Sequence, residues 1–281
     1  MKNLIILSCF LLGINSFSQI KGNVKNQERF EDFKQGRQYE SDITSLWVKD
    51  IKSNTYLKKT DVGLSLLKTL DISDIIAYNT IEEYEISENF STYIGVFGQN
   101  FERIDFHVYS ASKLTNQNYE LKLLMRQGTT IDTLSGHLKL IEAYEFPDFF
   151  DDENKQMFIF LYNFDFTSKN QVHGLTIKGT SSVAFYTQDK TARNFWSSDG
   201  TLSEYVRTFV GYYFDNKNNS KQNCIFSLQP AGLYTYLPFC ESFYSIDKYD
   251  NPEYYFINDK YRPFGWQDYD YRNPKKEEWW K

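Results

Sequence analysis

The side chains best suited to catalysis lie in one acidic loop, which contains Asp148, Asp151, Asp152 and Glu153. Two facing carboxylates can cleave a glycosidic bond, because one donates a proton while the other acts as nucleophile or base. Several together can also bind calcium, but calcium loops usually alternate their ligands and turn at a glycine, which this loop lacks. A solvated surface loop explains the same residues. A hydrolase that uses these carboxylates is therefore one alternative for this protein.

The histidines are His107, His137 and His173, and no two of them have the spacing of a metal-binding motif. Unrelated histidines on strands and turns explain them, so we expect no metal and no other cofactor. His107 follows Asp105 by two residues, which would place both on one face of a strand. A serine nearby would complete a hydrolase triad, but the chain has no Gly-x-Ser-x-Gly elbow to hold one. The sequence thus favours a protein without catalytic activity.

The first 18 residues have the order of regions typical of a secretion signal. Lys2 gives a positive start, residues 4–14 are mostly apolar, and residues 16–18 offer small side chains for cleavage, which would leave Gln19 first. The apolar run is shorter than the roughly 20 residues that cross a bilayer, and no later stretch is long and apolar enough. We therefore expect an exported protein, periplasmic, surface-held or extracellular, with no integral membrane span.

The net charge argues against one class of partner, and the cysteines predict a disulfide. The formal net charge of −6 argues against nucleic acid as a partner, because its phosphates are bound by basic patches. Cys224 and Cys240 are the two cysteines that follow the signal. Since exported compartments are oxidising, we expect a disulfide between them, which would close a loop of about 16 residues and stabilise by roughly 3 kcal/mol. Two reduced, buried thiols are the alternative.

The elements that would position these side chains are strands. Apolar and polar residues alternate through residues 90–146, and successive side chains of a strand point to opposite faces. Turn-forming stretches of hairpin length separate the alternating segments. The pattern predicts an antiparallel meander whose interior holds Ile104, Phe106, Val108, Leu121, Leu123, Phe160 and Phe164.

Further alternating segments extend the meander to residue 230, with strands expected over residues 158–166, 175–186, 205–214 and 224–228. Glycines such as Gly179 and Gly211 lie in or beside these patterns, where glycine often marks a bend that a closing sheet needs. The predicted fold class is therefore all-β, an up-and-down meander that closes into a barrel. A β-sandwich is the alternative.

The regions before residue 90 have weaker patterns. Residues 19–42 are polar and aperiodic, which predicts a loose arm, and residues 43–281 are expected to form a single β domain. Residues 46–48 and the pair Ile75–Ile76 predict strands, whereas Thr60-Asp61 predicts the start of a short helix over residues 64–70.

Residues 231–281 contain 16 aromatic residues, mixed with Asp, Asn, Pro and Arg, and show no sustained period. Disordered tails are poor in aromatic residues, and so many exposed rings would favour aggregation. We therefore expect an ordered, aromatic-rich C-terminal coil that covers the barrel. Four of its rings, Tyr254, Tyr255, Trp266 and Tyr269, are candidates for binding a ligand.

Four short segments, residues 101–106, 134–138, 209–213 and 263–266, resemble those of lipocalin-like and other secreted β-barrel proteins of Gram-negative bacteria. The Gly-x-Trp signature of true lipocalins is absent at the expected place. The resemblance implies an eight-stranded barrel with capacity for a ligand, and it implies no activity and no site residues.

These observations predict an exported binding or interaction module for a glycan, a small ligand or a partner protein. The hydrolase is one alternative, and a structural subunit of a surface complex is another. A barrel filled by its own side chains would favour an interaction protein, whereas a deep apolar barrel would favour a lipid-like ligand.

Overall fold

The computed structural model describes residues 43–78, 93–98, 100–169, 174–195, 202, 205–215, 220–228, 244–246, 255–267, 269 and 278–281. The predicted signal at residues 1–18 and the polar arm at residues 19–42 lie outside the described residues.

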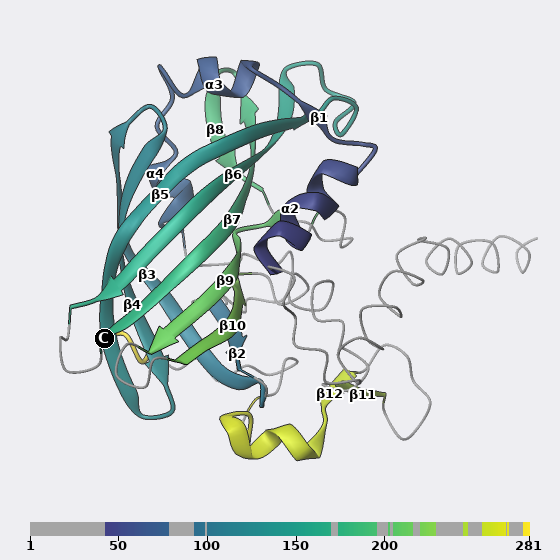
Figure 1. Cartoon of the computed structure of the whole chain (residues 1–281). Helices are drawn as coiled ribbons and strands as arrows, with labels where there is room; N and C mark the ends of the chain where they lie inside the picture. Colours follow the sequence, from purple (N-terminus) through teal and green to yellow (C-terminus); the bar gives the residue numbers. More distant parts are fainter. Residues whose placement is uncertain are drawn as a thin grey trace, which may run out of the picture. The chain divides into compact units, whose positions relative to one another are not determined.

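Strands dominate the described chain, and most of them belong to one antiparallel sheet (Figure 1). Along the chain each main strand pairs with the next, and β10 pairs back onto β2, so the hydrogen bonds form a closed ring. This confirms the predicted all-β meander and its closure. The ring consists of β2 (Tyr93–Phe97), β3 (Glu102–Thr115), β4 (Asn118–Gln127), β5 (Thr130–Phe146), β6 (Lys155–Ser168), β7 (Leu175–Gln188), β9 (Thr208–Asp215) and β10 (Ser220–Ser227).

Shorter elements flank the ring. In the main sheet β1 (Lys58–Lys59) pairs with β5 and β8 (Thr191–Asn194) pairs with β7. The strands β11 (Tyr244–Ile246) and β12 (Tyr255–Ile257) form a separate two-stranded sheet. The helical elements are α2 (Ile43–Ser53), α3 (Val62–Leu66), α4 (Ser73–Ile76) and the 3-10 helix η2 (Asp259–Phe264).

Large apolar side chains fill the interior of the barrel. The Phe209 and Phe226 rings stack with their centres 4.5 Å apart, and the Phe106 ring lies 4.0 Å from that of Phe226. Such packing follows from alternation, since every second residue of each strand points inward. All seven predicted interior residues are buried: Ile104, Phe106, Val108, Leu121, Leu123, Phe160 and Phe164.

Two glycines let neighbouring strands approach closely. Gly179 of β7 and Gly211 of β9 are register partners, and a Cβ on either would collide with the backbone of the other strand. Only glycine fits such an approach. The register between β7 and β9 is continuous here, so the two glycines mark a close approach of the strands rather than the expected bend.

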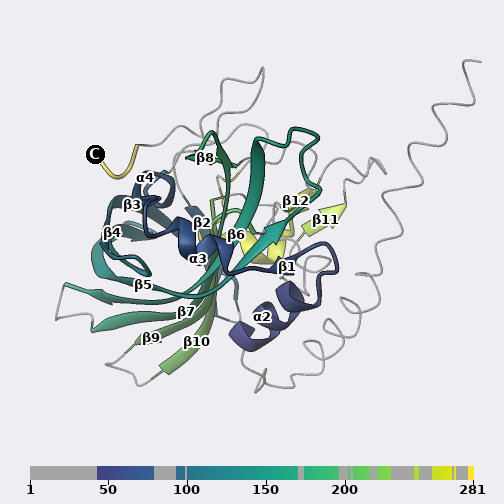
Figure 2. The ribbon, with the colours of Figure 1, turned by 90° about the horizontal axis from the view of Figure 1, so that it is seen from above.

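The segment that contains α3 and α4 closes one end of the barrel, as the view from above shows (Figure 2). Leu67, Ile72 and Ile75 are buried in the same apolar cluster as the interior side chains of the strands. Lys113 of β3 donates from Nζ to the carbonyl oxygens of Leu67 and Leu70, the latter at 2.8 Å. The segment is therefore part of the core rather than a surface connection.

Two sequence predictions in this region are wrong. Residues 46–48 belong to α2, where Trp47 and Ile51 are buried four residues apart on one helical face and α2 packs against β7 and β9. Helical spacing therefore outweighed the strand propensity of the individual residues. The pair Ile75–Ile76 belongs to α4. The start of this helix is held by Asp71, whose carboxylate accepts hydrogen bonds from the backbone N–H and the hydroxyl of Ser73. The predicted helix after Thr60-Asp61 is confirmed as α3, although it ends at Leu66.

Candidate functional site

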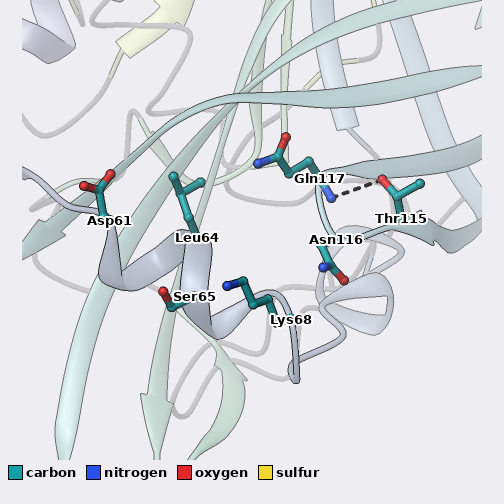
Figure 3. A pocket seen from close by; sticks show the side chains of 7 residues that line it. All are labelled: Asp61, Leu64, Ser65, Lys68, Thr115, Asn116 and Gln117. Atoms are coloured by element: carbon teal, nitrogen blue, oxygen red, sulfur yellow. Dashed lines mark hydrogen bonds between the residues drawn. The ribbon is translucent and has the colours of Figure 1, made fainter.

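A cleft of about 450 Å³ lies between α3 and the turn that joins β3 to β4 (Figure 3). We call it the α3 cleft. It is lined by Asp61, Leu64, Ser65, Lys68, Thr115, Asn116 and Gln117.

The helical side of the α3 cleft follows from sequence spacing. Asp61, Leu64, Ser65 and Lys68 occur at intervals of three and four residues, and such positions share one face of a helix. Thr60 Oγ1 accepts a hydrogen bond from the Val62 backbone N–H at 3.1 Å, which helps to fix the start of this helix. The face carries a carboxylate, a hydroxyl and an ammonium group around one aliphatic side chain.

The opposite side of the cleft is a turn held by its own side chains. Thr115 Oγ1 accepts hydrogen bonds from the Gln117 backbone N–H at 3.3 Å and from Asn118 Nδ2 at 3.0 Å. This arrangement holds the Asn116 and Gln117 amides opposite α3 (Figure 3). Each amide offers both a donor and an acceptor, so the cleft can bind a ligand that has many hydroxyl groups.

The α3 cleft has the groups for binding rather than for glycoside hydrolysis. Asp61 is the carboxylate among its lining residues, and hydrolysis in the usual mechanism needs a pair. The Lys68 ammonium balances the Asp61 charge, so an uncharged ligand fits better than an ion. Within the described residues, no group of three or more His, Cys, Asp or Glu side chains could hold a metal ion.

The acidic loop forms a surface turn outside the α3 cleft. Asp152 Oδ1 accepts a hydrogen bond from the Asn154 backbone N–H at 3.0 Å, and this bond is the main cause that lowers the pKa of the Asp152 carboxyl. Lys155 Nζ lies 3.7 Å from Asp152 Oδ2. Asp148, Asp151 and Glu153 are exposed. The loop is thus stabilised by local contacts, and none of its four carboxylates lines the α3 cleft.

Asp105 and His107 share the outer face of β3 but make different contacts. Asp105 is 2% exposed and accepts hydrogen bonds from Arg103 Nε at 2.9 Å and from Arg126 Nη2 at 2.6 Å. His107 stacks on Trp280, with ring centres 4.6 Å apart and an interplanar angle of 5°. The carboxylate therefore serves an ion-pair network, and the imidazole contacts the C-terminal end of the chain.

Aromatic residues from the C-terminal part of the chain lie over this network. The Arg103 guanidinium is 5.6 Å from the Trp266 ring centre and 5.4 Å from that of Tyr269, and Arg126 is 5.1 Å from that of Trp279. Trp266 Nε1 donates to the Phe101 carbonyl oxygen at 2.7 Å. These rings bind the two arginines of Asp105 by cation–π contacts and pack on the outside of the barrel.

The four candidate ligand-binding rings differ in whether the structure describes them and in how exposed they are. Tyr254 lies outside the described residues, and Tyr255 has a described backbone in β12 but no described side chain. Trp266 is 1% exposed, so its ring supports the fold and cannot serve as an open platform. Tyr269 is half-buried beside it, with ring centres 5.2 Å apart. Sequence reasoning missed the α3 cleft, although the spacing of residues 61, 64, 65 and 68 was a usable signal.

Cys224 lies on β10 opposite Phe97 and is 1% exposed. Burial raises the pKa of its thiol above the usual range. Within the described residues it makes no disulfide, and Cys240 lies outside them. The Cys224–Cys240 disulfide stays a prediction.

No described helix has the length and apolar character needed to cross a membrane. No family model matches the chain, and no curated protein or solved structure is significantly similar to it. The resemblance to lipocalin-like proteins therefore stays an expectation from the sequence.

Proposed function

We propose that the protein is a non-catalytic binding module of an exported compartment, which recognises a glycan in the α3 cleft. The observation that carries this proposal is the α3 cleft, a concave outer site with several convergent polar groups. Residues such as Phe106, Phe160 and Phe209 are at most 1% exposed, and this filled interior, which by itself would equally favour an interaction protein, places the proposed ligand on the outside.

The chemistry of the cleft favours a sugar over other small ligands. The Asp61 carboxylate can accept hydrogen bonds from neighbouring hydroxyl groups, and the Asn116 and Gln117 amides can both donate to them and accept from them. Leu64 is half-buried and offers an apolar surface to the carbon side of a sugar ring. The proposal keeps the glycan expected from the sequence but moves its site from the C-terminal rings to the α3 cleft. Export rests on the signal pattern of residues 1–18.

A glycan array followed by calorimetric titration of the strongest binder tests this function. Ser65 is exposed and lines the cleft, so Ser65→Trp should fill the cleft while leaving the core unchanged. Thr191→Trp introduces the same ring at an exposed position of β8 and serves as the control. We expect wild type and Thr191→Trp to bind and Ser65→Trp to lose at least ten-fold in affinity at an unchanged melting temperature. Equal affinity for the two tryptophan variants, or no glycan binding by wild type, would refute the proposal.

A further inference from the structure

Five aromatic side chains form a row across three parts of the chain: the segment before β1, the end of β5 with the loop that follows it, and β7. Each ring contacts the next. The ring centres are 5.7 Å apart for Tyr56 and Phe146, 5.2 Å for Phe146 and Phe149, 4.8 Å for Phe149 and Phe150, and 5.3 Å for Phe150 and Tyr186. We call these five residues the aromatic row.

The aromatic row is anchored to the protein and yet reaches the surface. Phe149 packs on Phe195, with ring centres 5.3 Å apart, and Phe195 is only 5% exposed. Tyr56 is 67% exposed, and the other four members of the row are half-buried. A contiguous exposed surface of this kind is typical of an interaction site, because scattered single rings would suffice if the side chains only filled space.

Carboxylates border the rings of this surface. Asp148 and Asp151 directly flank the Phe149-Phe150 pair in the sequence, and both are exposed. Among the described residues, neither of them takes part in an ion pair. The surface therefore combines aromatic faces with negative charge that is available to a partner.

Lys155 shows how a cation binds to these groups. Its Nζ lies 5.7 Å from the Phe150 ring centre and 3.7 Å from Asp152 Oδ2. One ammonium group thus contacts a ring and a carboxylate together, and both contacts are favourable for a Lys or Arg side chain. Arg193 is the register partner of Tyr186, so the chain's own cations lie toward the Tyr186 end of the row. The Tyr56 end is the part that is left for another molecule.

We propose that the aromatic row and its bordering carboxylates bind a partner protein through a segment rich in lysine and arginine. The aliphatic stems of such side chains would lie along the rings, while their charged ends reach Asp148 and Asp151. An acidic segment would be repelled, and a purely apolar one would leave the carboxylates without a partner. None of these residues lines the α3 cleft, so this interaction is independent of glycan binding.

Fluorescence anisotropy with the full chain tests this surface, and three labelled peptides serve as probes. The basic peptide repeats Lys-Gly-Arg-Ser, and the two others carry Glu or Gln in place of Lys and Arg. We expect only the basic peptide to bind, with an affinity that falls as salt is added. Tyr56→Ser should weaken this binding about three- to five-fold, in line with one exposed cation–π contact. Tyr109→Ser removes a ring that is 72% exposed on β3 and should leave the affinity unchanged.

A second pair of variants separates this surface from a general attraction to an acidic protein. Asp148→Asn/Asp151→Asn removes two charges beside the rings, and Asp74→Asn/Asp259→Asn removes two exposed charges on α4 and η2. The first double variant should lose about ten-fold in affinity and the second less than two-fold, both at an unchanged melting temperature.

Three results would overturn the proposal: equal losses in the two double variants, equal binding of the basic and Gln peptides, or an unchanged affinity in Tyr56→Ser. Sedimentation of the protein without peptide adds a fourth. A dimer of wild type that Tyr56→Ser dissociates would assign the surface to a second copy of the chain instead.

Discussion

The inner and outer faces of β3 and β4 are held together by different kinds of contact. On the inner face, Phe106 and its neighbours are buried among apolar side chains. On the outer face, Asp105 binds two arginines, and the Trp266, Tyr269 and Trp279 rings lie over those arginines. Burial of apolar surface has no directional requirement, whereas ion pairs and cation–π contacts depend on geometry. The inner face can therefore form from any suitable arrangement of apolar side chains. The contacts of the outer face form only when particular charged and aromatic side chains meet.

The largest effect is expected on the inner face. Phe106 is 0% exposed and its ring stacks on Phe226. Phe106→Ala should lower the free energy of unfolding by about 3–5 kcal/mol, because it removes buried surface and leaves a cavity. Urea titration measures this change. Ile131→Ala, at a side chain that is 51% exposed, is the control and should cost well under 1 kcal/mol. A similar small cost at Phe106 would contradict a filled interior.

A smaller loss in the free energy of unfolding is expected when Asp105, which binds two arginines on the outer face, loses its charge. Asp105→Asn keeps the shape of the side chain but weakens its hydrogen bonds to Arg103 and Arg126, and hydrogen bonds to charged groups contribute about 1.5–3 kcal/mol. We expect a loss of about 2 kcal/mol in urea titration. Asp165→Asn is the matched control, because its ion pair with Lys178 is about half exposed and should contribute little. Equal losses in the two variants would show that the buried network has no special role.

The third effect concerns how the C-terminal rings are attached. Trp266→Phe keeps an aromatic ring but removes the hydrogen bond from Nε1 to the Phe101 carbonyl oxygen. We expect a loss of about 1 kcal/mol, in line with a single hydrogen bond, and faster hydrogen exchange in η2. Trp280→Phe keeps the stacking on His107 and should change both quantities less. Unchanged exchange in both variants would mean that Trp266 does not hold η2 on the barrel.

The smallest effect is the loss of stability at low pH that follows from protonation of Glu142, a residue on the outside of the barrel. Glu142 on β5 accepts from Tyr144 at 2.6 Å, and Lys52 and Lys59 lie at 3.1 and 2.9 Å. Partial burial alone would raise the pKa of Glu142, but the hydrogen bonds from Tyr144, Lys59 and Lys52 outweigh it and lower the pKa to about 2.

Because the folded-state pKa lies below the usual value, the stability from Glu142 is fully present above about pH 4.5 and is lost as the pH falls toward about 2. Water screens the two largely exposed lysines, so we expect a loss of roughly 0.5 kcal/mol, smaller than that of Trp266→Phe. Urea titrations between pH 6 and pH 2.5 should show a shallower fall in Glu142→Gln than in wild type. Parallel pH profiles would contradict this role.

The sequence by itself determined the meander and its interior. Alternation is a local property, since each residue of a strand points opposite to its neighbour whatever the strand pairs with. It was sufficient to predict that Ile104, Phe106 and Leu121 are inside, whereas closure of the sheet was predicted from the order of the hairpins and from the glycines, with a β-sandwich as the alternative. The strand predictions for residues 46–48 and for Ile75–Ile76 were wrong, because short apolar runs suit both a helix and a strand. Packing against the barrel decided in favour of the helix.

Only the tertiary structure decided which side chains meet across the chain. Trp266 reaches Phe101 over 165 residues, and Arg207 reaches Ile75 over 132. The α3 cleft likewise joins residues 61–68 to residues 115–117. No local period connects such positions, because their distance is set by how the strands close and how α3 and α4 seal the barrel end. Burial of Trp266 and of Arg207 is a property of that arrangement, and it becomes visible only in three dimensions.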